Sequence, residues 1–325
     1  MLSEVMEYYG FKKPFDHLGY FETEHHAHLA KELKIAIGQG RLVALAGVVG
    51  CGKTTTLQRL MMNLRESKEV IVSRSLTVDK ERVKLGTFIT ALFYDLSTEK
   101  DFKPPTQPET RERKLLELMQ KRRSPVALFV DDAHDLHHRT LIGLKRLIEL
   151  VRLYGSGGSL SIVLAGHPKL KNDLRRPSLE EIGGRATVFS LEGIRTHQRE
   201  YIEWVLAQAS GGSVELTELL SEEAIALLVS RLATPLQIEQ YLTLAFEEAY
   251  SIGSKPITAE VIETVLAVGL DDLEPHLTRN GYNAKVLAEL LNVRPAEVRS
   301  FLHGQLPPGR TQDLREKMLK VGIPV

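Results

Sequence analysis

The sequence of 325 residues has few of the features of secreted and membrane proteins, namely cysteines and long apolar runs. Its one cysteine, Cys51, excludes an intrachain disulfide, which suits a reducing compartment. No apolar run approaches the roughly 18–20 residues that a membrane-spanning helix needs, and the first residues lack the apolar core of a signal peptide. The formal net charge is zero, so affinity for nucleic acid must come from local basic patches. These absences predict a cytoplasmic protein with no membrane partner.

A glycine-rich loop stands between a predicted strand, residues 42–46, and a predicted helix, residues 56–64. The loop fits the pattern G-x-x-x-x-G-K-[ST], in which glycines let backbone N–H groups approach phosphate oxygens. The lysine supplies a cation to the β- and γ-phosphates, and the hydroxyl that follows can ligate Mg²⁺. The sequence therefore predicts a nucleotide site with the phosphate-binding residues Gly47, Val48, Val49, Gly50, Cys51, Gly52, Lys53, Thr54 and Thr55.

A second apolar run, residues 126–130, ends in the acidic pair Asp131 and Asp132. In phosphoryl-transfer sites, one carboxylate after a strand holds Mg²⁺ and a neighbouring group orients the attacking water. We therefore expect Asp131 to share Mg²⁺ with Thr54 and Asp132 to orient water. With Lys53, these residues form the predicted catalytic set of an ATPase.

Strands that alternate with helices predict an α/β fold with a parallel three-layer sheet. A further buried strand, residues 160–165, is followed by Gly166, His167 and Pro168, which break it. Thr54, Asp131 and His167 all fall at or just beyond the carboxyl ends of predicted strands, where the ligand crevice of such a sheet lies.

An aromatic-rich segment, residues 8–21, precedes the predicted sheet. Its rings are placed to pack either against an adenine or, as an N-terminal arm, on the core, and the pattern leaves both open. His25, His26 and His28 lack a fourth ligand, so no metal site is predicted there.

The order of these parts resembles the AAA+ ATPase family over about residues 10–265. Within the family it is similar to general-secretion-A-type (ExeA-like) ATPases and to transposition ATPases related to Mu B and TnsC. The residues that carry the resemblance are 11–15 (Phe-Lys-Lys-Pro-Phe), the phosphate loop, 131–134 (Asp-Asp-Ala-His) and 163–168 (Val-Leu-Ala-Gly-His-Pro). The resemblance implies an AAA+ P-loop sheet with an α-helical lid, and ATP and Mg²⁺ as cofactors.

The resemblance also implies roles for single residues. His167 looks like the sensor-1 residue, which reads the γ-phosphate and completes the predicted catalytic set. Arg185 looks like the arginine finger that reaches a neighbouring subunit's nucleotide, with Arg175 and Arg176 as competing candidates.

Two positions depart from the family pattern. The family usually carries glutamate where this chain has Asp132, whose arm is one methylene shorter, so we expect slow turnover. Gln237 stands where many members carry a sensor-2 arginine, so we do not expect a second γ-phosphate sensor.

The chain from Gly281 onward reads as helix, tight turn, helix. Asn292 tolerates a left-handed turn, Pro295 suits a first helical turn, and Val298 and Phe301 share one face. The pattern is similar to a helix-turn-helix of phage-repressor type, whose second helix enters the major groove, and a three-helix protein-binding module is the alternative.

Basic residues near this turn and after the second strand are the candidates for DNA contact. From Arg279 to the end there are eight basic and four acidic residues, a local net charge of +4. The strand-associated residues are placed either to face a DNA channel, as the family implies, or to form a solvated face. The candidates are Lys80, Arg82, Lys84, Arg294, Arg299 and Ser300.

A chain of this length predicts more than one domain. We expect an N-terminal segment packing on the ATPase core (1–40), a P-loop ATPase core (41–195), a helical lid (196–268) and a helix-turn-helix-like all-α domain (269–325). The predicted function is an ATP-dependent DNA-binding protein that assembles with its own copies, as a ring or helical filament, on double-stranded DNA. It would recruit or activate a transposase in DNA transposition and recombination, with slow hydrolysis stimulated by DNA or partner. The alternatives are a secretion-type ATPase, whose relatives add a membrane span and a wall-binding domain, and a nucleotide-switched transcription regulator.

Overall fold

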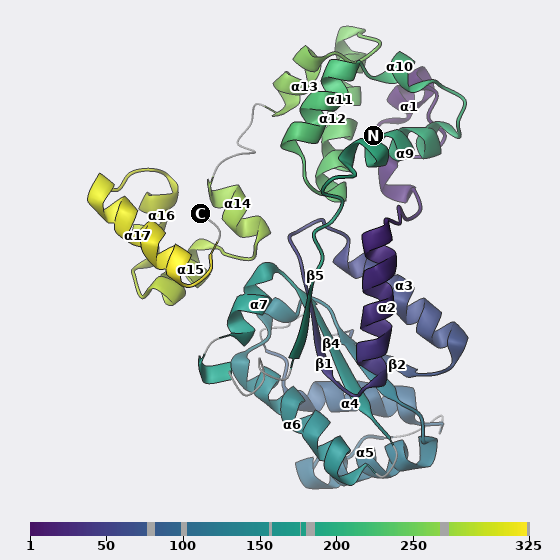
Figure 1. Ribbon diagram of the computed structural model, residues 1–325, viewed down its shortest axis with the longest axis vertical. Helices are drawn as coiled ribbons and strands as arrows, with labels where there is room; N and C mark the ends of the chain where they lie inside the picture. Colours follow the sequence, from purple (N-terminus) through teal and green to yellow (C-terminus); the bar gives the residue numbers. More distant parts are fainter. Residues whose placement is uncertain are drawn as a thin grey trace. The chain divides into compact units, whose positions relative to one another are not determined.

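The computed structural model divides the chain into two compact bodies (Figure 1). The sheet body comprises residues 24–47 and 53–191, and the helical body comprises residues 1–23, 48–52 and 192–325. The described residues are 1–76, 82–98, 103–155, 158–175, 177–179, 186–266 and 273–323.

The sheet body is a five-stranded parallel sheet with helices on both faces. The strand order is β2-β3-β4-β1-β5, and all four neighbouring pairs are parallel. Figure 1 shows α2 and α3 on one side of the strands and α6 and α7 on the other. This confirms the predicted three-layer α/β fold. The elements are α2 (Glu24–Gly38), β1 (Leu42–Ala46), α3 (Lys53–Ser67), β2 (Ile71–Arg74), α4 (Leu85–Leu96), α5 (Pro108–Arg122), β3 (Val126–Val130), the 3-10 helix η2 (Ala133–Asp135), α6 (His138–Tyr154), β4 (Leu160–Gly166), α7 (Pro168–Leu174), the 3-10 helix η3 (Pro177–Leu179) and β5 (Ala186–Ser190).

The register of the sheet brings the ends of three strands level. Strands β1, β3 and β4 are buried along their whole length, as expected for parallel strands covered on both faces. Ala46 pairs with Gly166, and Val130 pairs with Leu164. The residues that leave these strands therefore emerge at one edge of the sheet.

The helical body contains the first helix of the chain and the helices after residue 192. Its elements are α1 (Ser3–Tyr9), the 3-10 helix η1 (Phe15–His17), α9 (Gln198–Ser210), α10 (Leu216–Leu219), α11 (Glu222–Arg231), α12 (Pro235–Ile252), α13 (Ala259–Leu266), α14 (Leu273–Arg279), α15 (Ala284–Leu291), α16 (Pro295–Leu302) and α17 (Pro308–Lys320).

The aromatic N-terminal residues pack into the core of the lid helices. The rings of Tyr9, Phe11 and Phe15 surround Phe246 of α12, with centroid distances of 4.8, 4.9 and 5.8 Å. The sequence leaves open whether these rings pack against an adenine or on the core, and in the structure they pack in a core. The sequence predicts an N-terminal segment, residues 1–40, that packs on the ATPase core. Instead, residues 1–23 belong to the helical body, and the segment that follows forms α2 of the sheet body.

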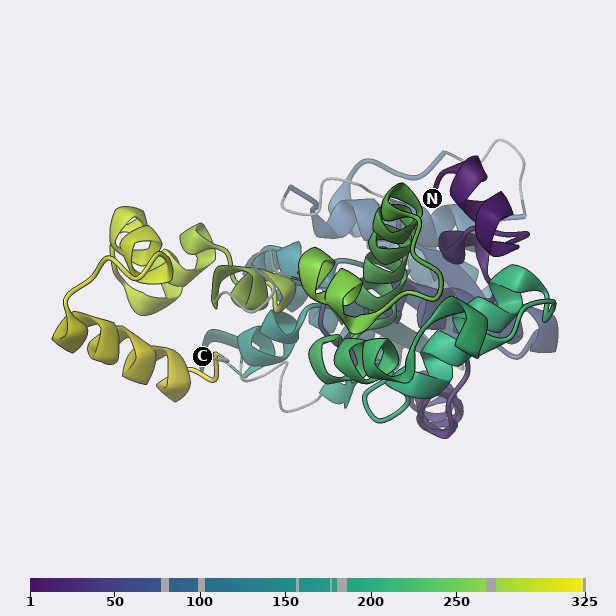
Figure 2. The ribbon, with the colours of Figure 1, turned by 90° about the horizontal axis from the view of Figure 1, so that it is seen from above.

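The last four helices surround a hydrophobic core of their own, drawn in yellow-green to yellow in Figure 2. Asn292 has a φ of +52° and ends α15, and Pro295 occupies the first turn of α16, as the sequence predicted. Val298 and Phe301 are buried in this core together with Leu287 of α15. The chain from α14 onward therefore has the packing of a small all-α unit.

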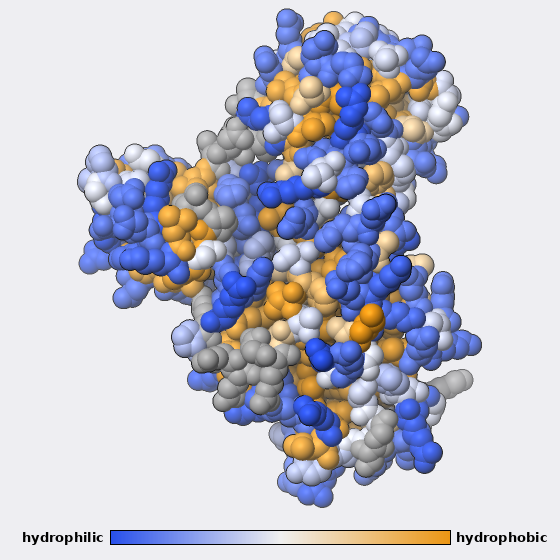
Figure 3. Space-filling view, viewed as in Figure 1, coloured by the Kyte–Doolittle hydropathy of each residue, from blue (hydrophilic) through white to orange (hydrophobic). Residues whose placement is uncertain are grey.

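Hydrophilic side chains cover much of the face seen in Figure 3, with smaller hydrophobic patches between them. None of the described helices is both long and apolar enough to cross a membrane.

Replacement of Phe11 by alanine should destabilise the helical body. Phe11 is 6% exposed, and the change empties space beside Phe246. Truncation of a buried phenylalanine costs about 3–5 kcal/mol in free energy of unfolding, whereas an exposed site changes it by about 0.5 kcal/mol or less. Urea unfolding followed by circular dichroism measures this, with Leu2→Ala as the control because Leu2 is 63% exposed. Equal losses in the two variants would contradict the packing role.

Candidate nucleotide site

Lys53, Thr54 and Asp131 meet at the carboxyl edge of the sheet. Lys53 is buried at the start of α3, and its Nζ donates to the Gly47 carbonyl at 2.9 Å. Thr54 Oγ1 donates to Asp131 Oδ2 at 2.7 Å, so the start of α3 is tied to the end of β3 across 77 positions of sequence. The structure thus brings together the motif lysine, the motif hydroxyl and the first carboxylate of the acidic pair.

The Thr54 hydroxyl and the Asp131 carboxylate suit a magnesium ion. Mg²⁺ prefers oxygen ligands, and it is usually bound through one or two carboxylates together with substrate phosphates and several waters. The two oxygens lie within hydrogen-bond distance of each other and are both exposed at the sheet edge. The residues present therefore fit the expected ion.

Asp132 turns the chain where it leaves β3. Its backbone has a φ of +52° and a ψ of +36°, in the left-handed region, and its N–H donates to Asp131 Oδ1 at 3.0 Å. Aspartate enters this region more readily than longer side chains because its short polar group bonds locally. The turn gives a physical reason for aspartate at a position where the family usually has glutamate.

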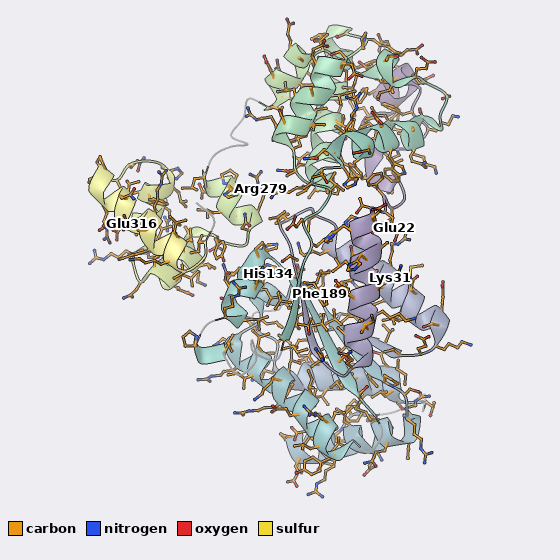
Figure 4. All side chains as sticks on the ribbon, viewed as in Figure 1. Glu22, Lys31, His134, Phe189, Arg279 and Glu316 are labelled. Carbon is orange, nitrogen blue, oxygen red and sulfur yellow. The ribbon has the colours of Figure 1, made fainter. Side chains whose placement is uncertain are left out.

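Two imidazole rings stack just beyond the ends of β3 and β4. His134 of η2 and His167, which precedes α7, have ring centroids 3.7 Å apart and an interplanar angle of 27°. Figure 4 labels His134 at this end of the sheet body. Nδ1 of each ring is buried, with no hydrogen-bond partner among the described residues. His134 belongs to the motif of residues 131–134, and the sequence alone predicts no role for it.

The stack depends on the glycine that ends β4. A Cβ at Gly166 would lie 3.0–3.2 Å from the backbone N, the Cβ and the Nδ1 of His134. These contacts are tighter than nearly all real Cβ contacts, so a side chain at this position would require the ring and backbone of His134 to shift by a few tenths of an ångström. Gly166 therefore sets how closely η2 approaches β4.

Both histidines are held neutral at pH 7. Burial lowers the pKa of His134 to about 4, with Lys169 and Lys53 lowering it further and Asp131 opposing them. Burial also lowers the pKa of His167 to about 4, and electrostatic interaction with His134 and with Lys53 lowers it further. The effect of Lys53 on both groups puts the two rings in the field of the lysine that the motif assigns to phosphate.

The middle of the phosphate loop, Val48–Gly52, groups with the helical body. Gly50 has a φ of +79°, and a Cβ there would lie 2.5 Å from the Cβ of Leu236. The Gly50 carbonyl accepts from the Leu236 N–H at 3.4 Å, and the Val49 N–H donates to the Arg279 carbonyl at 2.9 Å. Both the backbone conformation and the close approach require glycine at position 50.

Gln237 caps a helix. Thr234 is the N-cap of α12, and its Oγ1 accepts from the Gln237 N–H at 3.3 Å. In return, Gln237 Oε1 accepts from the Ala233 N–H at 3.1 Å. This reciprocal arrangement is a variant of the capping box, and it gives the Gln237 side chain a structural role.

The remaining predicted residues are dispersed. Arg176, Arg185 and Lys80 lie outside the described residues, and Arg175 is exposed at the end of α7. Arg82 and Lys84, after β2, are exposed, and so are Arg294 and Arg299 of the α16 region, while Ser300 is half-buried.

Comparison with known proteins agrees with this architecture. A family model described as "AAA domain" matches residues 36–174. The solved structure of Cdc6p from Pyrobaculum aerophilum is 20% identical with a TM-score of 0.54, over 99% of this chain and 84% of that one. The ORC2 protein of Aeropyrum pernix (ADPNP-ADP complexes) is 13% identical with a TM-score of 0.53, over 97% and 86%. Drosophila ORC bound to DNA is 16% identical with a TM-score of 0.54, over 97% and 82%. A search of the curated proteins found no match. Residues 36–174 are thus similar to an AAA domain, and the predicted AAA+ P-loop fold is confirmed.

The buried His134 should make the protein less stable at acid pH. Its pKa is about 4 in the folded chain and about 6.5 when unfolded, so the unfolded state takes up a proton first as pH falls below 6.5. Between pH 7 and pH 5 this removes about 2 kcal/mol from the free energy of unfolding. Lys53, Lys169, Asp131 and Asp135 face the same ring and remain in His134→Phe.

Urea unfolding of the wild type and of His134→Phe at the two pH values tests this. The wild type should lose about 2 kcal/mol more than the variant between pH 7 and pH 5. An equal loss in both proteins would show that His134 is not held neutral by the fold.

Proposed function

We propose that this chain, a nucleotide-hydrolysing ATPase built on an AAA domain, assembles with copies of itself on double-stranded DNA when ATP is bound. In this proposal the assembly recruits or activates a transposase, and hydrolysis of ATP dissolves it. The observation that carries the proposal is the presence in one chain of an ATPase site and a separately packed, basic all-α unit.

The basic all-α unit, α14 to α17, supports DNA binding through α16, the helix that follows the tight turn. Arg294 is the N-cap residue of α16 and Arg299 lies within that helix, and both side chains are exposed. Arg294 at the start of this short helix and Arg299 in its last turn place exposed basic groups along a helix that follows a tight turn, which suits docking into a major groove. The fold is similar to that of Drosophila ORC, which was solved bound to DNA, and that likeness agrees with the proposal.

The nucleotide chemistry follows from the residues at the sheet edge. Lys53 would meet the β- and γ-phosphates, and Thr54 and Asp131 would hold Mg²⁺. When bound, the ion neutralises negative charge on the phosphates. Asp132 would orient the attacking water from a short arm, which favours slow turnover. His167 would read the γ-phosphate.

A nucleotide-switched transcription regulator is the second candidate. The helices α15 and α16 pack around their own core, and such a unit is equally suited to read an operator sequence. Selection of binding sites from random DNA separates the two functions. A palindromic preferred site favours the regulator, whereas broad binding that requires ATP favours the transposition function.

Asp132→Asn should abolish most hydrolysis and keep ATP binding. The amide cannot accept a proton from water, and loss of a general base typically costs about 10²–10⁴-fold in rate. Phosphate release gives the rate and calorimetry gives the affinity, with Asp95→Asn as the control because Asp95 is exposed on α4. Hydrolysis at the parent rate in Asp132→Asn would remove Asp132 from the mechanism.

Electron microscopy with ATP and duplex DNA tests assembly directly. We expect DNA-bound rings or filaments with ATP, and weaker DNA binding in Arg294→Ala and Arg299→Ala. Loss of one phosphate contact should lower the slope of log K against log salt by about 1. Arg315→Ala is the control, because Arg315 is an exposed residue of α17. Persistent monomers with no DNA-bound assembly would sink the proposed function.

A further inference from the structure

The stacked pair His134–His167 joins the segments that follow two neighbouring strands, β3 and β4. His134 follows β3, and His167 is the residue directly after β4 and before α7. Their centroid separation of 3.7 Å with a 27° angle places the two rings face to face. Since β3 and β4 are paired in the sheet, the strand register itself brings the two histidines into contact.

Two further contacts fix His134 in this place. Lys169 Nζ donates to the His134 carbonyl at 3.0 Å and to Asp173 Oδ2 at 2.8 Å, so α7 holds the backbone of η2. Gly166 contributes by leaving the space that His134 fills. The orientation of the His167 ring is therefore set by a neighbour whose own position is fixed by a lysine and a glycine.

Each ring of the stack has one buried nitrogen atom that makes no hydrogen bond to the described residues. The Nδ1 atoms of both rings are buried with no hydrogen-bond partner among the described residues, and His134 is 8% exposed. A buried polar atom without a protein partner is costly, and such atoms are found where strain or a catalytic role is built into a site, or where water or an ion binds. Lys53, the residue assigned to phosphate, acts electrostatically on both rings.

We propose that His134 and His167 form one phosphate sensor, in which His134 is a positioning residue that fixes the ring of His167 so that the site distinguishes ATP from ADP. This inference rests on the role of His167 in the proposed function. His134 acts through the ring that it stacks on and not by touching the nucleotide. Only the γ-phosphate differs between the two nucleotides, so loss of the stack lowers the preference for ATP and leaves the affinity for ADP unchanged.

Three variants separate positioning from simple packing. His134→Ala removes the stacking ring, and His134→Phe keeps a flat ring in the same place without the nitrogen atoms. Gly166→Ala leaves the other side chains of the site unchanged but displaces His134 by a few tenths of an ångström, since the added Cβ would lie 3.0–3.2 Å from it. His138→Ala is the matched control, because His138 belongs to a second adjacent pair, His137–His138, that is exposed at the start of α6.

Calorimetry with the full chain in Mg²⁺, without DNA, gives the dissociation constants of ADP and of a non-hydrolysable ATP analogue. We expect the wild type, His134→Phe and His138→Ala to prefer the triphosphate by similar factors. His134→Ala and Gly166→Ala should lose about tenfold of this preference, equivalent to about 1.4 kcal/mol, with the ADP dissociation constant unchanged within about twofold.

A purely structural role predicts a different pattern, in which both nucleotides weaken together. That result would overturn the proposal. So would an unchanged preference for the triphosphate in His134→Ala and Gly166→Ala, or a wild type with no such preference. NMR provides a second readout if His134→Ala does not fold. The imidazole signals of His167 should respond to the ATP analogue and not to ADP in the wild type and in His134→Phe, and a response equal for both nucleotides would overturn it. Because no DNA is present, this outcome is independent of whether assemblies form on DNA.

Discussion

The pairing of β3 with β4 in a sheet covered on both faces is the constraint on which the nucleotide site depends. A buried parallel strand satisfies its backbone polar groups through its neighbours, so functional groups concentrate where strands end. With Val130 opposite Leu164, the residues that leave the two strands emerge together. The hydrogen bond from Thr54 to Asp131 then ties this edge to the first turn of α3.

Local backbone requirements account for several residues that depart from the family pattern or lack an evident chemical role. Asp132 occupies a left-handed turn, which favours aspartate over the glutamate that the family resemblance implies. Gln237 is engaged in capping α12, so its side chain has a structural use at a position where relatives place a cation. Gly50 and Gly166 lie where a Cβ would contact a neighbour too closely, Leu236 in the first case and His134 in the second. In each case the chain's path selects the residue, and the chemistry available at that position follows.

The fold and the phosphate-binding motif could be predicted from the sequence because both are local patterns. Apolar runs ending in Asp131 or His167 identify buried strands and the chemistry at their ends without knowledge of strand order. The stack of His134 on His167 could not be predicted in this way, because it depends on which strands are neighbours and on their register. The division of the N-terminal segment was missed for a related reason. The aromatic pattern around Phe11 indicates burial, but it does not say which of two cores receives the rings.

The all-α unit formed by α14 to α17 has a closed hydrophobic core, and this has an evolutionary consequence. Buried residues such as Leu287, Phe301 and Leu314 are satisfied within the unit, so they constrain its fold without involving the ATPase residues. Substitutions on the exposed side of α16 therefore leave this core unchanged. Selection can therefore vary the exposed face of α16 while the fold of the unit is kept. The end of α14 is less free to change, because the Arg279 carbonyl accepts from the Val49 N–H of the phosphate loop.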